Sequence, residues 1–110
     1  MWEDEISIAF LDANPVKKGH VLLVPKEHYS DILEINDVLY SKLLINAKRL
    51  SIKIRDTVKS PRVGFAIEGF GVDHLHIHLV PVYEGGDLNP EKAYKASEEE
   101  LKEMQKKISF

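Results

Sequence analysis

The hydrophobic positions near the start of the chain form two short, strand-like runs. Residues 6–11 (ISIAFL) are apolar and partly β-branched, and they end in the turn-prone sequence DANP. Residues 21–24 (VLLV) form a second apolar run between a glycine and the proline of VPK. Two such runs joined by a polar loop predict an antiparallel pair of strands.

The pattern then changes to a helical spacing. Apolar residues recur at steps of three and four over residues 35–58, as on one face of a long amphipathic helix: Leu39, Leu43, Ala47, Leu50, Ile54 and Val58. Asn36 or Asp37 is expected to cap its start, and Pro61 prevents its continuation.

Two more strands and a second helix complete the prediction. Residues 63–69 (VGFAIEG) and 72–82 (VDHLHIHLVPV) are expected to be strands, and residues 83–90 form a loop by composition. The segment SEEELKEMQKKI begins with a capping box of Ser97 and Glu100. This order predicts an α+β fold, in which an antiparallel sheet carries one long helix and a C-terminal helix. A length of 110 residues suits a single domain, residues 1–110.

Composition excludes several classes of protein. The net charge of −3 is unlike the basic surface of a nucleic-acid binder. The chain has no cysteine, which excludes disulfides and thiolate metal sites. Its acidic start is unlike a signal peptide, and no apolar run approaches the ~20 residues of a membrane span. We therefore expect a soluble cytoplasmic protein that binds neither nucleic acid nor membrane.

Three of the five histidines lie within five residues, at strict alternation. On a strand, His74, His76 and His78 would share one face with Val72 and Val80. The intervening apolar residues would then face the core. Three imidazoles in register on an otherwise solvated face indicate chemistry, because histidine is a common acid, base, nucleophile and metal ligand.

Two chemistries compete for this cluster. The imidazoles could ligate a metal such as zinc, or they could handle a phosphate as nucleophile, acid and orienting group. The preceding GFG favours phosphate, because backbone amides there can face an anion. The next acid along the chain, Glu84, is poorly spaced for a metal site. We expect no metal and no other cofactor, with a histidine metal site as the alternative.

Two motifs resemble those of histidine triad (HIT) proteins. Residues 74–80 (HLHIHLV) match the family's His-φ-His-φ-His-φ-φ, where φ is apolar. The segment AFLDANPVKKGHVLLVPKEH resembles the N-terminal half of the same family. The resemblance covers residues 5–83. It implies a HIT-like fold, a two-fold homodimer, and hydrolysis or transfer at the α-phosphate of a nucleotide through a covalent nucleotidyl-histidine intermediate.

The resemblance also implies roles for individual residues. His76 would be the nucleophile, His78 would stabilise or protonate the leaving group, His74 would support their geometry, and His20 would be a fourth histidine against the triad. An attacking imidazole must keep its proton on the other ring nitrogen, which then needs an acceptor such as a backbone carbonyl. Gly69, Gly71 and Val72 would offer backbone amides to the phosphate.

The nucleoside would be held by the segment around Asp12. In the family a polar group here binds the ribose hydroxyls, whereas an aspartate before ANP also suits a loop turn. Phe10, Leu11 and Ala13 would wall the base, with Phe10 as a core residue in the alternative. Lys26 and His28 are more simply an exposed strand end.

The sequence leaves the substrate open among purine nucleotide conjugates: nucleoside phosphoramidates, dinucleoside polyphosphates or adenylylated adducts. In particular, the loop EGFGVDH lacks the hydroxyl side chain that many members carry before the triad. A nucleotide-binding module with little turnover is the alternative function.

Overall fold

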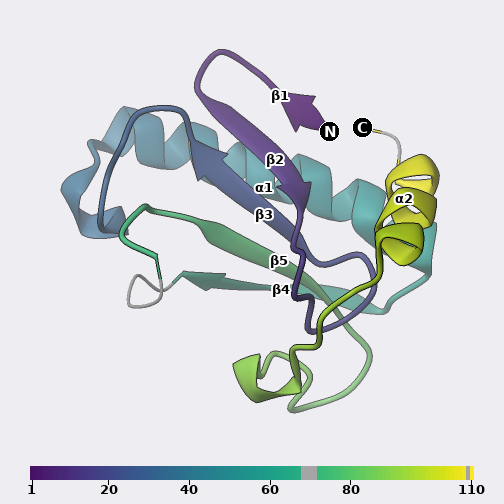
Figure 1. Cartoon of the computed structure of the whole chain (residues 1–110). Coiled ribbons are helices and arrows are strands. Elements are labelled where there is room, and N and C mark those ends of the chain that lie inside the picture. The colour runs from purple at the N-terminus through teal and green to yellow at the C-terminus, as the bar shows by residue number, and fades with distance from the viewer. Residues whose placement is uncertain (68–71, 109) are drawn as a thin grey trace.

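The computed structural model describes residues 1–67, 72–108 and 110. These residues form a five-stranded antiparallel sheet of order β1-β2-β3-β5-β4. The strands are β1 (Trp2–Glu3), β2 (Ser7–Leu11), β3 (Val21–Pro25), β4 (Arg62–Ile67) and β5 (Ile77–Val82). The helices are α1 (Asp37–Val58) and α2 (Glu98–Lys107), with 3₁₀ turns η1 (Ile32–Glu34) and η2 (Pro90–Lys92). Figure 1 shows α1 across one face of the sheet, which confirms the predicted α+β class.

Helix α1 buries the predicted apolar stripe against the sheet. Its residues Leu43, Ala47, Leu50 and Ile54 are at most 3% exposed and belong to the same core cluster as the inward residues of β3 and β5. Of the two candidate caps, Asn36 is the one observed, and its side-chain oxygen accepts a bond of 2.9 Å from Leu39 N–H. The other face of the sheet is therefore not covered by α1.

Helix α2 begins at the predicted cap and joins the same core. Ser97 Oγ accepts a bond of 3.1 Å from Glu100 N–H. Met104 and Ile108 are buried in the cluster that contains the α1 stripe. Among the described residues, neither helix has an apolar stretch that could cross a bilayer.

The histidine-bearing strand is shorter than the sequence predicted. We expected residues 72–82 in a strand, but β5 begins at Ile77. In the preceding segment Leu75 N–H donates to Tyr29 C=O, and His74 N–H donates to Val72 C=O at 2.8 Å, so a turn replaces the ladder. The alternation nevertheless continues, because Leu75 and Ile77 are both buried. The predicted strand 63–69 corresponds to β4, and its last two positions lie outside the described residues.

Strand β1 has only two residues, too few to show an alternating pattern, and a polar network anchors the turn after it. Both carboxylate oxygens of Asp4 are used: one accepts bonds from Ile6 N–H, Ser7 N–H and Ser7 O–H, and the other accepts a bond of 2.8 Å from Asn46 of α1. Burial raises the pKa of Asp4, but these donors outweigh it and the pKa lies below its ordinary value. The network ties the start of the sheet to the helix.

Candidate active site

The register of the central strands brings the predicted site residues together on the uncovered face. Leu11 of β2 pairs with Val21 of β3, so Asp12 and His20, which lie just beyond these residues, are neighbours, and Asp12 N–H donates to His20 C=O at 3.0 Å. Leu22 of β3 pairs with His78 of β5. Three segments that are far apart in sequence therefore meet at one pocket of about 330 Å³.

His20 and His78 share a short hydrogen bond whose direction is fixed by the backbone. Val16 N–H donates to His20 Nδ1 at 3.0 Å, so a neutral His20 carries its proton on Nε2. That nitrogen lies 2.9 Å from His78 Nδ1, which must accept. A neutral His78 therefore has its own proton on Nε2. Burial lowers the pKa of His20 to about 4, against the opposing effect of Asp12, so His20 is neutral at physiological pH.

Asp12 serves the loop and faces the histidine pair at the same time. Its Oδ1 accepts a bond of 2.8 Å from Asn14 N–H, which is the expected turn contact. Its Oδ2 lies 3.5 Å from His20 Nε2 and 4.0 Å from His78 Nδ1. A role in the loop turn and a role in binding the ribose are therefore compatible for Asp12, because Oδ1 forms the turn and Oδ2 faces the histidine pair.

The backbone fixes the tautomer of a neutral His76. Its Nδ1 lies 2.7 Å from His74 C=O, and since a carbonyl only accepts, Nδ1 must carry a proton. In the neutral ring the lone pair is then on Nε2. The rings of His76 and His78 are 4.9 Å apart, centroid to centroid, at 73°. His74 in turn donates through Nε2 to Pro25 C=O at 3.2 Å, which anchors the triad segment to β3.

His28 also holds the triad segment, which the sequence reasoning missed. Its Nε2 donates to Asp73 C=O at 2.6 Å, and its ring packs edge-on against His74 with centroids 5.1 Å apart. The signal was the pairing of β3 with β5, because extending its register beyond Pro25 places His28 opposite Val72, next to Asp73. Lys26, the other residue considered there, forms a surface ion pair of 2.7 Å with Glu3.

None of the three residues expected to wall the base lines the pocket. Phe10 is 40% exposed on the uncovered face, in the cross-strand row of Leu22 and His78, but it lies outside the lining of the pocket. Leu11 alternates to the other face and packs against the core, so its side chain is not where a base wall was expected. Ala13 is exposed on the loop and does not line the pocket. For the phosphate, Val72 lines the pocket, whereas Gly69 and Gly71 lie outside the described residues.

The far wall of the pocket comes from the segment after β5, which sequence reasoning treated only as a loop. Its lining residues are Leu88, Asn89, Pro90 and Ala93. The segment is fastened to the Asp12 loop, because Tyr94 N–H donates to Pro15 C=O and Ala96 N–H to Ala13 C=O, both at 3.1 Å. No local sequence pattern predicts where this segment lies, because each of the two bonds joins residues about 80 positions apart in the chain.

A buried carboxylate fixes the same segment. Asp87 is 1% exposed, and one of its oxygens accepts bonds from Tyr83 N–H (2.8 Å) and Glu84 N–H (3.1 Å). The other oxygen lies 3.6 Å from Lys17 Nζ and 3.5 Å from Lys92 Nζ. The bond from Tyr83 N–H is the main reason that the pKa of Asp87 is lowered. Asp87 is therefore a structural anion that also engages the two nearby lysines.

One group of ligand-type atoms is present in the described part of the chain, where Asp12, His20 and His78 bring such atoms within 4.8 Å of one another. A metal at this point would need a lone pair on His20 Nε2, but Val16 N–H occupies Nδ1 and leaves the proton on Nε2. The donation of His74 Nε2 and His76 Nδ1 to carbonyls does not bear on this, because metal-ligating histidines make the same bond through their other nitrogen. The proton on His20 therefore disfavours a metal at this group of three, and a metal on the triad stays the alternative.

Comparison with known sequences identifies relatives along most of the chain. An uncharacterized HIT-like protein of Mycoplasma genitalium is 38% identical over 106 residues, covering 89% of this chain and 75% of that protein. The adenosine 5'-monophosphoramidase of Schizosaccharomyces pombe is 32% identical, covering 97% of this chain and 83% of the enzyme. The bis(5'-adenosyl)-triphosphatase of Dictyostelium discoideum is 29% identical, covering 96% and 77%.

Comparison with solved structures also finds relatives along most of the chain. A hypothetical histidine triad nucleotide-binding protein of Sulfolobus tokodaii is 31% identical with a TM-score of 0.80, covering 97% of this chain and 78% of that chain. A HIT-like protein of Bartonella henselae is 26% identical with a TM-score of 0.85, covering 97% and 81%. The HIT domain model matches residues 1–85. The chain, with its triad segment and its antiparallel sheet, belongs to the HIT domain family.

Proposed function

We propose that this HIT-domain protein is a nucleotide-binding hydrolase or transferase that acts at the α-phosphate of a purine nucleotide conjugate. The observation that carries the proposal is the bond from His76 Nδ1 to His74 C=O, because it places the lone pair of the neutral ring on Nε2, as attack on phosphorus requires. The named phosphoramidase and triphosphatase among the relatives support this class of reaction.

In the first step His76 Nε2 attacks the α-phosphorus, a P–N bond forms, and the bond from phosphorus to the leaving group breaks. The leaving group takes that bond's electron pair together with the proton on His78 Nε2. His20 keeps this proton in place, because its own Nε2–H donates to His78 Nδ1. The product is a nucleotidyl-His76 intermediate.

In the second step water attacks the same phosphorus and restores His76. Its proton passes to the emptied Nε2 of His78, and the P–N bond breaks with its electrons returning to His76. The released product is the mononucleotide; another acceptor in place of water would make the protein a transferase. The proposed reaction uses no cofactor.

Asp12 is proposed to bind the ribose. Its Oδ2 faces the pocket beside the histidine pair, and a carboxylate can accept bonds from both hydroxyls. Phe10, in the same cross-strand row as His78, is proposed to pack on the base.

The test is mononucleotide release from a panel of AMP and GMP conjugates, by the wild type and by His76→Asn. We expect turnover by the wild type and a loss of several orders of magnitude in the variant, with nucleotide affinity kept within about tenfold, or roughly 1.4 kcal/mol. Tight binding without turnover by the wild type would instead identify a nucleotide-binding module.

We also propose a homodimer that pairs through β4. This strand ends the sheet in the described residues, and Phe65 and Ile67 on it are 41% and 39% exposed. Light scattering should give twice the 12.6 kDa of one chain, and Phe65→Asp should shift the mass toward one chain. That residues 1–110 form one domain and that the protein is cytoplasmic remain predictions.

A further inference from the structure

The pocket extends from the histidines toward β4 and away from Phe10. Ala66 of β4 pairs with His78, and Gly64 pairs with Val80, so these two small residues lie beside the histidine row on the uncovered face. Val80 lies on the histidine face but is only 1% exposed. Under the proposed function the nucleoside lies on the β2 side. The space beside Ala66 and Val80 is then the place of the leaving group.

Leu88 closes the pocket at its β4 end and packs against Gly64. A Cβ added to Gly64 would lie 3.2 Å from Leu88 Cδ2 and 3.4 Å from Val82 Cγ2, so the absence of a side chain on β4 makes room for Leu88. Asp87, next to Leu88, is fastened by its four contacts. The segment around Leu88 is therefore held in place by its packing on Gly64 and by the contacts of Asp87.

The lining of this end is mainly apolar, with Asn89 as its polar side chain, and its described residues include no cation. The described residues around the whole pocket are Asp12, three histidines, two asparagines and apolar residues, with no lysine or arginine. Of the four lysines in the neighbouring loops, Lys17 and Lys92 are engaged by Asp87, while Lys18 and Lys95 are exposed and do not line the pocket. Residues 68–71 (EGFG) also contain no basic residue. A polyphosphate leaving group would enter an uncompensated site that already faces the Asp12 carboxylate.

We infer that the segment 87–93 is a specificity wall that selects an uncharged, apolar leaving group, such as the amine of a nucleoside phosphoramidate, over a polyphosphate. The inference rests on the proposed function and names its substrate class. Leu88, 40% exposed, is the residue through which the selectivity can be changed without disturbing the core.

The experiment compares kcat/KM for the benzylamine phosphoramidate of AMP and for diadenosine triphosphate, with EDTA present so that no metal neutralises the phosphates. Wild type should favour the phosphoramidate at least about tenfold. Leu88→Lys should shift the ratio toward the triphosphate by about tenfold, because it supplies one charge-assisted contact. The matched control is Ile45→Lys, which adds the same charge at a half-exposed position of α1, on the other side of the sheet. It should leave the ratio unchanged.

A preference of the wild type for diadenosine triphosphate would overturn the inference while leaving the proposed function intact. An equal shift of the kcat/KM ratio in Leu88→Lys and Ile45→Lys would also overturn the inference and leave the proposed function intact. A loss of affinity for AMP itself in Leu88→Lys would show that the wall belongs to the nucleoside. If the wild type turns over neither compound, the proposed function fails. Binding of the two compounds to His76→Asn then tests the wall alone, with tighter binding of the phosphoramidate expected and tighter binding of the triphosphate contradicting it.

Discussion

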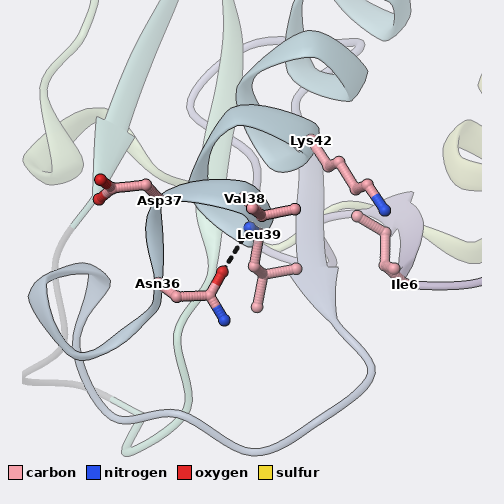
Figure 2. A pocket seen from close by; sticks show the side chains of 6 residues that line it. All are labelled: Ile6, Asn36, Asp37, Val38, Leu39 and Lys42. Atoms are coloured by element: carbon pink, nitrogen blue, oxygen red, sulfur yellow. Dashed lines mark hydrogen bonds between the residues drawn. The ribbon is translucent and has the colours of Figure 1, made fainter.

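Two hollows of this molecule differ in size and in chemistry, and three of the five histidines line the smaller one. The hollow at the start of α1 measures about 570 Å³, against about 330 Å³ for the histidine pocket. Figure 2 shows that Asn36 is turned to Leu39 N–H as the helix cap, while the charged side chains of Asp37 and Lys42 point in different directions. In the histidine pocket, by contrast, backbone groups fix where each ring carries its proton. Volume alone does not identify a site, whereas converging groups with assigned protons do.

After the loss expected from His76→Asn, the largest effect that separates the two hollows should come from His78. His78→Ala removes the proposed acid, so kcat/KM for a phosphoramidate with a basic amine should fall about 10²–10⁴-fold. The loss should be much smaller for a nitrophenyl ester of AMP, whose leaving group needs no proton. Steady-state rates with both substrates measure this. Equal losses with both would contradict the acid role.

A pH-dependent stability should follow from His20. Its pKa is about 4 in the folded protein against ~6.5 in the unfolded chain, so only the unfolded chain takes up this proton as the pH falls through that window. The stabilisation is fully present above pH ~6.5 and is lost toward pH ~4, by on the order of 3 kcal/mol. Urea unfolding across this range should show a steeper loss for the wild type than for His20→Gln. Parallel curves would rule out a buried, neutral His20.

Asp12 should affect nucleotide affinity more than folding. Asp12→Ala should cost on the order of 1.5–3 kcal/mol of AMP binding. Asp12→Asn is the matched variant, because it keeps an acceptor for Asn14 N–H while removing the charge. Calorimetry with AMP and with 2',3'-dideoxy-AMP distinguishes the roles: the cost should vanish with the dideoxy compound. An undiminished cost there would remove the ribose assignment.

The smallest effect is expected at the larger hollow. Asn36→Ala removes the cap of α1 and should lower the free energy of unfolding by about 1 kcal/mol. It should leave kcat/KM within twofold of the wild type, because the hollow lies on the helix side of the sheet. Thermal melts and the same rate assay test both statements. A tenfold change in rate would mean that the two hollows are coupled.

The local sequence predicted both helices and most of the strands, because the spacing of apolar residues decides which face of an element is buried. This spacing predicted the buried stripe of α1. Residue type predicted the caps, with Asn36 as one of two candidates for α1 and Ser97 for α2. The start of β5 was not, because a turn at Val72–His74 replaces the ladder there. The wall at Leu88 was also missed, since its place depends on Gly64 and on bonds to the Asp12 loop that are distant in sequence. Alternation thus indicated the candidate reactive residues, while long-range pairing determined what surrounds them.

The proposed reaction requires that His76, held by His74 C=O, form a covalent bond to phosphorus. The most direct test of this bond is rapid quenching of the wild type with labelled AMP conjugate at neutral or alkaline pH, where a phosphoramidate survives, followed by peptide mapping. We expect a nucleotidyl group on His76 that forms and decays at rates consistent with turnover, and none in His76→Asn. Turnover with no trapped adduct, together with full activity in His76→Asn, would contradict it.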